Sequence, residues 1–110
     1  MARYKSARSQ ACDISPAVKA AVWERDGHRC VLCLSPQAMP NAHYIPRSDG
    51  GLGVEKNIVT LCARCHRQYD QSTQRPHLQA ELRAYLLYIY KGDWDESSLR
   101  YRGVRIWKNY

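Results

Sequence analysis

The spacing of apolar residues predicts a helix in each half of the chain. The first begins at Ser15-Pro16, a favourable helix start, and ends at Gly27. The second begins at Pro76 and ends at Gly92, and its apolar stripe consists of Leu78, Leu82, Leu86 and Ile89. A stripe of this kind predicts packing against a core rather than contact with a cofactor or partner.

Between these two helices the pattern changes to short extended segments. We expect a loop over 35–41, a strand over 41–46, and a glycine-rich loop over 48–53. Residues 58–61 are β-branched and apolar, which favours a second strand or a tight extended segment. Residues 65–70 contain no Pro or Gly and predict the start of a helix. The order is therefore strand, loop, strand, helix.

The two ends of the chain differ from this middle region. Residues 1–13 are expected to form a flexible basic arm, and 14–92 a single domain. Residues 93–110 form a basic, aromatic extension. Its last part alternates basic and bulky residues, which favours either an edge strand or an arm that lays aromatic rings and arginines on nucleic acid.

Two Cys-x-x-Cys pairs separated by 28 residues are the strongest motif: Cys30-Val-Leu-Cys33 and Cys62-Ala-Arg-Cys65. Two such turns supply four thiolates for a closed tetrahedral zinc site. Disulfides are the alternative, but the first residues lack the apolar core of a signal peptide. We therefore expect a reducing, cytoplasmic location, in which paired cysteines bind metal. Cys12 stands alone and is expected to be a buried or tail cysteine.

A metal would also support the core. The chain has no Phe, and its eight Tyr and three Trp suit half-buried positions, so the predicted core is thin. Structural zinc contributes about 10–16 kcal/mol in small peptides, comparable to the stability of a whole domain. We therefore expect zinc removal to unfold the central region.

The net charge of +7 is confined to the two ends. Residues 1–12 and 97–110 hold seven basic side chains and no acid, whereas residues 13–96 hold ten of each sign. Basic ends around a neutral middle suit a protein that binds a polyanion such as DNA. Solubility alone would explain the same pattern.

Further motif residues lie within and beside the cysteine span. They are Ala42-His43-Tyr-Ile-Pro46-Arg-Ser-Asp-Gly-Gly51 and Asn57-Ile-Val-Thr-Leu-Cys62-Ala-Arg-Cys65-His66. With the cysteine pairs, they resemble an HNH endonuclease of the ββα-metal class, and their wording resembles small phage-encoded members. The resemblance covers residues 30–70 and is weaker from about 16 to 90. It implies an α+β fold: a short β-hairpin and a helix form a ββα-metal core over 30–72, stapled by zinc and flanked by N- and C-terminal helices.

The resemblance implies metal-dependent hydrolysis of DNA phosphodiester bonds. His43 would be the general base, since an imidazole pKa of about 6.5 suits work near neutral pH. His66 would bind one divalent ion, and Asn57 would hold the loop and ring of His43. Each residue has a structural alternative: His43 as a capping or surface residue, His66 as a spare zinc ligand, and Asn57 as a turn residue.

One position departs from the family pattern. The residue before the base usually supplies a metal ligand, but here it is Ala42. Asp70 lies four residues after His66, so on a helix both side chains reach one point. His66 and Asp70 would suit Mg²⁺ or Mn²⁺, which keep several waters, better than a second zinc. If Asp70 is merely a solvated acid, Asn57 itself becomes a candidate to approach the metal.

The remaining expectations concern partners. Four basic residues flank the motif and are candidates for DNA-backbone contacts: Arg47, Lys56, Arg64 and Arg67. The similarity to phage-encoded proteins implies a location in the cytoplasm of the host cell. It also implies a partner, the large subunit of a DNA-packaging terminase. The alternative function is a non-catalytic zinc-bound module that binds DNA or protein.

Overall fold

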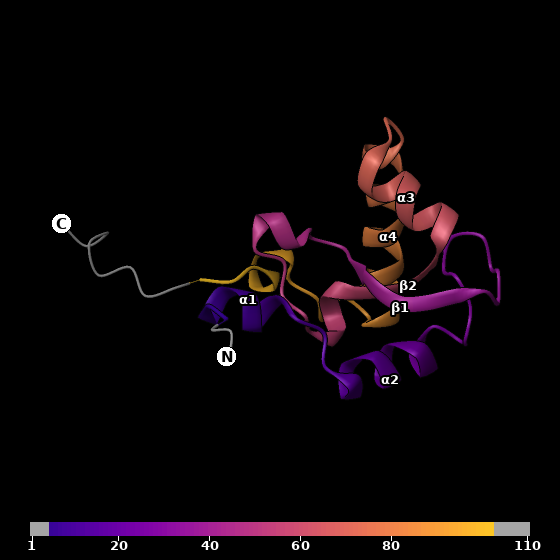
Figure 1. Cartoon of the computed structure of the whole chain (residues 1–110). Coiled ribbons are helices and arrows are strands. Elements are labelled where there is room, and N and C mark those ends of the chain that lie inside the picture. The colour runs from indigo at the N-terminus through magenta and orange to yellow at the C-terminus, as the bar shows by residue number, and fades with distance from the viewer. Residues whose placement is uncertain (1–4, 103–110) are drawn as a thin grey trace.

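An antiparallel pair of strands lies at the centre of the molecule, with helices on both sides of it (Figure 1). The computed structural model describes residues 5–102. Its helices and strands are α1 (Ala7–Cys12), α2 (Pro16–Arg25), β1 (Ala38–His43), β2 (Ile58–Cys62), α3 (Ala63–Gln71) and α4 (Arg75–Ile89). Three short 3-10 helices span Arg47–Asp49, Glu55–Asn57 and Glu96–Leu99. The predicted α+β architecture is confirmed.

The hairpin is built so that β2 is covered on both faces. Every residue of β2 is buried, which fits the β-branched and apolar composition of 58–61. Strand β1 pairs with it from Ala38 opposite Cys62 to His43 opposite Ile58, with a register irregularity between Met39 and Ala42. Pro40 lies within that irregularity and has no N–H to donate to the ladder.

The helices begin and end much as the sequence predicts. The Ser15 hydroxyl accepts a hydrogen bond from the backbone N–H of Val18 at the start of α2, and Gly27 follows its end with a φ of 71°. In α4, Leu82 and Leu86 are fully buried, which confirms that the stripe faces the core. Helix α3 begins at Ala63, two residues before the predicted start, because the Cys62 side chain caps it.

The predicted boundaries differ from the structure in three places. Strand β1 begins at Ala38, inside the expected loop, and ends at His43. Residues 7–12 of the expected arm form helix α1, capped by Ser6 and anchored by buried Cys12. In the C-terminal extension, Trp94 and Leu99 belong to the core, whereas residues 103–110 lie outside the described residues.

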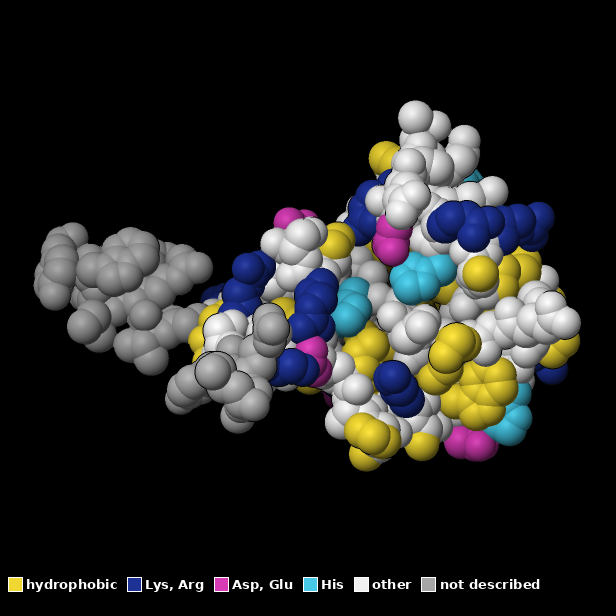
Figure 2. Space-filling model, viewed as in Figure 1, with side chains coloured by type: hydrophobic (Ala, Val, Ile, Leu, Met, Phe, Trp, Pro, Cys, Tyr) yellow, Lys and Arg dark blue, Asp and Glu magenta, His cyan; other side chains and the backbone are white. Residues whose placement is uncertain are grey.

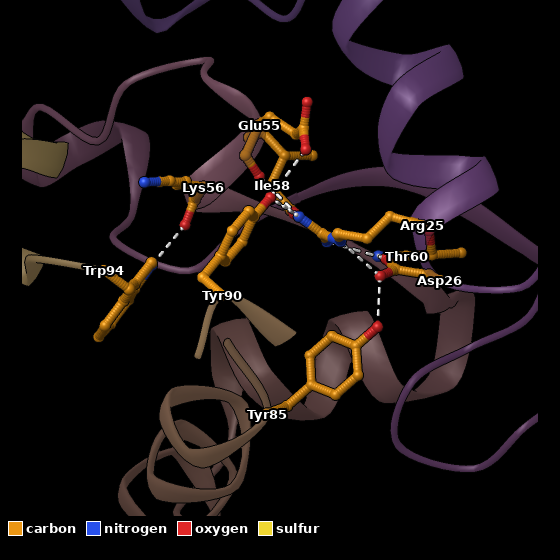
Figure 3. Close-up of polar contacts among 9 residues, drawn as sticks. All are labelled: Arg25, Asp26, Glu55, Lys56, Ile58, Thr60, Tyr85, Tyr90 and Trp94. Atoms are coloured by element: carbon orange, nitrogen blue, oxygen red, sulfur yellow. Dashed lines mark hydrogen bonds and ion pairs between the residues drawn. The ribbon is translucent and has the colours of Figure 1, made fainter. Parts of the chain in front are cut away.

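A buried polar network ties α2 to α4 and to the segment that precedes β2 (Figure 3). Arg25 forms a two-point ion pair with Asp26, with N···O distances of 2.8 and 3.0 Å. Its guanidinium also donates to the carbonyls of Glu55 and Ile58. Asp26 in turn accepts from the backbone of Thr60 and from the Tyr85 hydroxyl of α4. The network therefore fixes both ends of residues 55–58.

Opposite charges stabilise this buried pair. Burial of the guanidinium lowers the pKa of Arg25, but the hydrogen bond and the charge of Asp26 outweigh that effect and raise it overall. Within residues 5–102, no helix is both long and apolar enough to cross a membrane.

Candidate active site and cysteine centre

The four cysteines of the two Cys-x-x-Cys pairs meet at one point. The sulfurs of Cys30, Cys33, Cys62 and Cys65 all lie within 4.8 Å of one another. The Cys33 and Cys62 sulfurs are 3.6 Å apart, near the spacing of about 3.8 Å that four Zn–S bonds of about 2.3 Å give in a tetrahedron. This cluster is a metal centre in its geometry, and its donor set suits zinc.

The backbone of each turn also prepares its sulfurs for a cation. The N–H of Cys33 points at the sulfur of Cys30, at 3.5 Å, and the N–H of Cys65 points at the sulfur of Cys62, at 3.4 Å. A hydrogen bond from the Ser35 backbone lowers the pKa of Cys33 to about 7, whereas burial and the neighbouring sulfurs raise that of Cys65. Four adjacent thiolates repel one another, and a divalent cation removes that cost.

On the same hairpin–helix unit, an open cavity of about 450 Å³ brings together residues from several elements. It is lined by His43, Pro46, Arg47, Ser48, His66, Asp70 and Arg75. Figure 2 shows histidine side chains near the centre of this face, with basic side chains on either side of them. The cavity joins the end of β1, the loop after it, helix α3 and the start of α4.

His43 lies at the last position of β1 and is half-buried. Its Nε2 atom lies 2.8 Å from the carbonyl oxygen of Cys12, at the end of α1. A carbonyl can only accept, so Nε2 carries the proton in the neutral ring and Nδ1 is the free acceptor. Burial lowers the pKa of His43, and this effect outweighs the opposing one of the Cys12 hydrogen bond; Arg47 lowers it further.

His66 and Asp70 lie one turn apart on α3 and face each other. The distance from His66 Nε2 to Asp70 Oδ2 is 3.1 Å, and both side chains are partly exposed to the cavity. An imidazole nitrogen and a carboxylate oxygen side by side fit a divalent ion that keeps several waters. The structure therefore brings together the two residues predicted as ligands of a catalytic ion, with His43 lining the same cavity.

Asn57 occupies a different place from the other predicted site residues. It is fully buried, its side-chain oxygen accepts from the N–H of Ile45, and its amide group donates to the carbonyls of Ile45 and Leu52. These contacts tie Asn57 to the loop that follows His43. It does not hold the His43 ring, which is the work of the Cys12 carbonyl, and it does not line the cavity.

The alanine that departs from the family pattern is part of the core. Ala42 is fully buried within the apolar cluster and does not line the cavity. Neighbouring residues on a strand point to opposite faces of the sheet. The face onto which Ala42 points is filled by apolar side chains. An acid at this position would need a polar partner in that core.

The basic residues predicted to contact DNA lie in three different places. Arg47 lines the cavity, where its guanidinium also pairs with Asp13 and Ser9 of the N-terminal segment. Arg64 and Arg67 are exposed on α3. Lys56 instead donates to the Asp93 carbonyl beside the Tyr90 ring and does not line the cavity.

Sequence reasoning missed two groups that shape the cavity: one lines it, and the other orients His43. Arg75, at the start of α4, lines it, stacks on the ring of Tyr69 at 4.2 Å, and donates to the carbonyl of Tyr69. The second is the Cys12 carbonyl. Neither could be found from a motif. Arg75 lies beyond the HNH pattern, and every residue has a backbone carbonyl, so no residue type marks this one.

Comparison with known proteins agrees with the geometry. Residues 30–72 match the model of a family described as HNH endonuclease. The chain is also similar to Anaredoxin from Nostoc sp. (strain PCC 7120), with 36% identity over 47 residues. That alignment covers 42% of this chain and 62% of the relative, so the chain spans less than two thirds of the relative's length. We call residues 30–72 the HNH segment, after the family whose model they match.

Proposed function

We propose that this chain is a metal-dependent DNA endonuclease that hydrolyses phosphodiester bonds with His43 as the general base. The observation that carries the proposal is the convergence of His43, His66 and Asp70 on one open cavity, which Arg47 of the HNH segment and Arg75 just beyond that segment also line. A zinc-bound binding module without catalysis would have no use for this convergence.

The chain's own residues account for the proton transfer. Because Nε2 of His43 donates to the Cys12 carbonyl, Nδ1 takes a proton from the attacking water, and the hydroxide forms the new bond to phosphorus while the bond to the leaving 3′ oxygen breaks. Asn57 keeps the loop after His43 in place through the Ile45 and Leu52 backbone. This hydrogen-bonded framework keeps the base in one orientation.

Positive charge beside the phosphate is supplied from two sides of the cavity. Arg47 and Arg75 lie in its wall and can donate to phosphate oxygens. A Mg²⁺ or Mn²⁺ ion held by His66 and Asp70 would neutralise charge on the phosphate and on the leaving oxygen. Arg64 and Arg67, exposed on α3, would contact the DNA backbone on either side.

Cleavage of supercoiled plasmid by zinc-loaded protein, with Mg²⁺ or Mn²⁺, tests the proposal. We expect His43→Ala to reduce the rate by about 10²- to 10⁴-fold, the usual contribution of a general base, and to leave DNA binding unchanged and the protein folded at the assay temperature. The matched control is His77→Ala, an exposed histidine on α4 that does not line the cavity. An intact plasmid with every divalent ion, or equal rates for both variants, would favour the non-catalytic binding module instead.

A more specific proposal rests only on the similarity of the motif sequence to small phage-encoded proteins. We propose that the protein acts in phage DNA packaging beside the large subunit of a terminase, in the host cytoplasm. Mixing the purified protein with a terminase large subunit should alter the position or the number of cuts on a defined duplex. Identical cut maps with and without the terminase would remove the proposed partnership.

A further inference from the structure

Two apolar hollows continue from the candidate active site along the same face of the molecule. The first, of about 450 Å³, lies between β1 and the start of α3, and its wall includes Met39 and Leu61. The second, of about 320 Å³, lies between β1 and α2, where Trp23 and Pro40 line it. Figure 2 shows hydrophobic side chains gathered over β1 and α2 on the face that carries the histidines.

Shared wall residues make the three spaces neighbours on the surface. His66 lines both the active-site cavity and the first hollow. Ala38 lines both the first hollow and the second. A chain molecule bound at His43 and His66 could therefore extend over β1 to α2 without leaving the surface of the protein.

The chemistry of the hollows differs from that of the cavity. The Met39 side chain is 59% exposed, although burial of a thioether would be favourable. The ring of Trp23 is partly exposed and stacks on His28, with a distance of 4.9 Å between the ring centroids. Among the described residues that line the hollows, only Lys19 and His66 ionise. Duplex DNA shows its charged backbone to a protein surface and needs cations there. Unpaired bases show apolar faces and edges that donate and accept hydrogen bonds, and aromatic rings bind them.

We propose that the two hollows bind unpaired bases of the DNA strand that continues from the scissile phosphate. The preferred substrate is then DNA with a single-stranded segment beside the cut, such as a fork, a flap or a gap. This inference rests on the proposed nuclease function for the cut itself. The binding of unpaired bases can be measured without any cleavage.

The test compares hollow variants with a matched control from elsewhere on the surface. Trp23→Leu keeps an apolar side chain but removes the stacking ring, and Met39→Ser removes the exposed thioether. Tyr88→Ser is the control, because Tyr88 is 81% exposed on α4 and lines none of the three spaces. Melting curves and zinc content verify that each variant is folded.

Fluorescence anisotropy then measures binding of a labelled oligothymidylate of about 12 nucleotides, within the usual site sizes for single strands, and of a duplex of the same length. We expect Trp23→Leu to weaken oligothymidylate binding at least about fivefold, the lower limit for losing one stacked base. Met39→Ser should weaken it by a smaller factor, and neither variant should change duplex binding by more than about twofold. Tyr88→Ser should change neither. In cleavage assays with Mn²⁺, wild type should cut a fork faster than the duplex, and the hollow variants should lose that preference.

Several results would overturn the inference. Equal losses on both DNAs, or no loss on either, would show that the hollows do not bind bases. If the hollow variants lose self-association in sedimentation experiments and bind oligothymidylate as wild type does, the hollows are an interface between copies of this chain. Failure of wild type to cut any DNA would remove the proposed function, whereas the anisotropy results would still decide whether the hollows bind bases.

Discussion

The cysteine centre and the candidate catalytic cavity lie on the same hairpin–helix unit, but they are built in opposite ways. The cysteine centre takes all four donors from two short turns, and the four sulfurs all lie within 4.8 Å of one another. The cavity takes its residues from β1, a loop, α3 and α4, and a carbonyl from α1 orients its proposed base. A closed set of four donors stabilises a fold, whereas a pair of donors in an open cavity leaves room for water and phosphate.

The largest expected effect separates the two regions by their role in folding. Cys62→Ser removes one of four zinc donors but keeps an oxygen that can cap α3, so we expect loss of bound zinc and, with it, of a cooperative melting transition. Circular dichroism and metal analysis measure both. Cys12→Ala is the control, because Cys12 lies outside the cluster and keeps its carbonyl after the substitution. A normal melting curve for Cys62→Ser would contradict the role of the shared centre.

Arg25→Met tests the network that connects the fold to the cavity. The substitution leaves Asp26 buried without its cation, which typically costs about 3–5 kcal/mol. It also frees the Glu55 and Ile58 carbonyls, so the segment that carries Asn57 loses its clamp and DNA cleavage should fall further than unfolding alone explains. Denaturant titration and cleavage at a temperature where the variant is folded measure the two effects.

The control for this network is a neighbouring arginine. Arg29→Met removes an exposed guanidinium and should change stability by no more than about 0.5 kcal/mol. Zinc content should stay unchanged in both variants, because neither arginine belongs to the set of four cysteine donors. If Arg25→Met matches Arg29→Met in stability and activity, the buried network positions nothing.

Asp70→Asn affects the cavity alone. It removes one of two proposed ligands, and we expect the Mn²⁺ concentration for half-maximal cleavage to rise at least as much as the 10- to 100-fold that loss of an outer-shell partner typically causes. Zinc content and melting should match wild type. Asp93→Asn, at a carboxylate that is 94% exposed, is the control. An unchanged Mn²⁺ requirement would show that Asp70 is a solvated acid.

The smallest effect concerns pH. His43 must be neutral to accept a proton, and burial together with Arg47 lowers its pKa, while Asp70 raises it and His66 lowers it. Activity should therefore persist as the pH falls through about 6.5, the ordinary histidine value, and decline only below it. Arg47→Gln removes a positive charge near His43 and should move the acid limb of kcat/KM to higher pH. A limb that stays in place would exclude electrostatic coupling between the two residues.

The sequence predicted the parts of the molecule that depend on local pattern. The cysteine spacing defined the metal centre, helical periodicity defined α2 and α4, and a separation of four residues placed His66 beside Asp70. What the sequence could not predict depends on tertiary contact. Residues 7–12 read as an arm because their single buried side chain, Cys12, has no periodic partner. Arg75 reads as an ordinary residue of a helix start until α4 folds back beside α3.

The contact between His43 and the Cys12 carbonyl has a consequence for protein engineering. The HNH segment begins at residue 30, and α1 lies entirely before it. The residue that follows α1 packs closely on Gly53. A Cβ added to Gly53 would lie 1.9 Å from the carbonyl oxygen of Asp13. A graft of residues 30–72 into another scaffold would carry every motif residue and still leave the imidazole free to rotate. A graft that keeps the proposed base oriented must therefore start before residue 30 and include the Cys12 carbonyl.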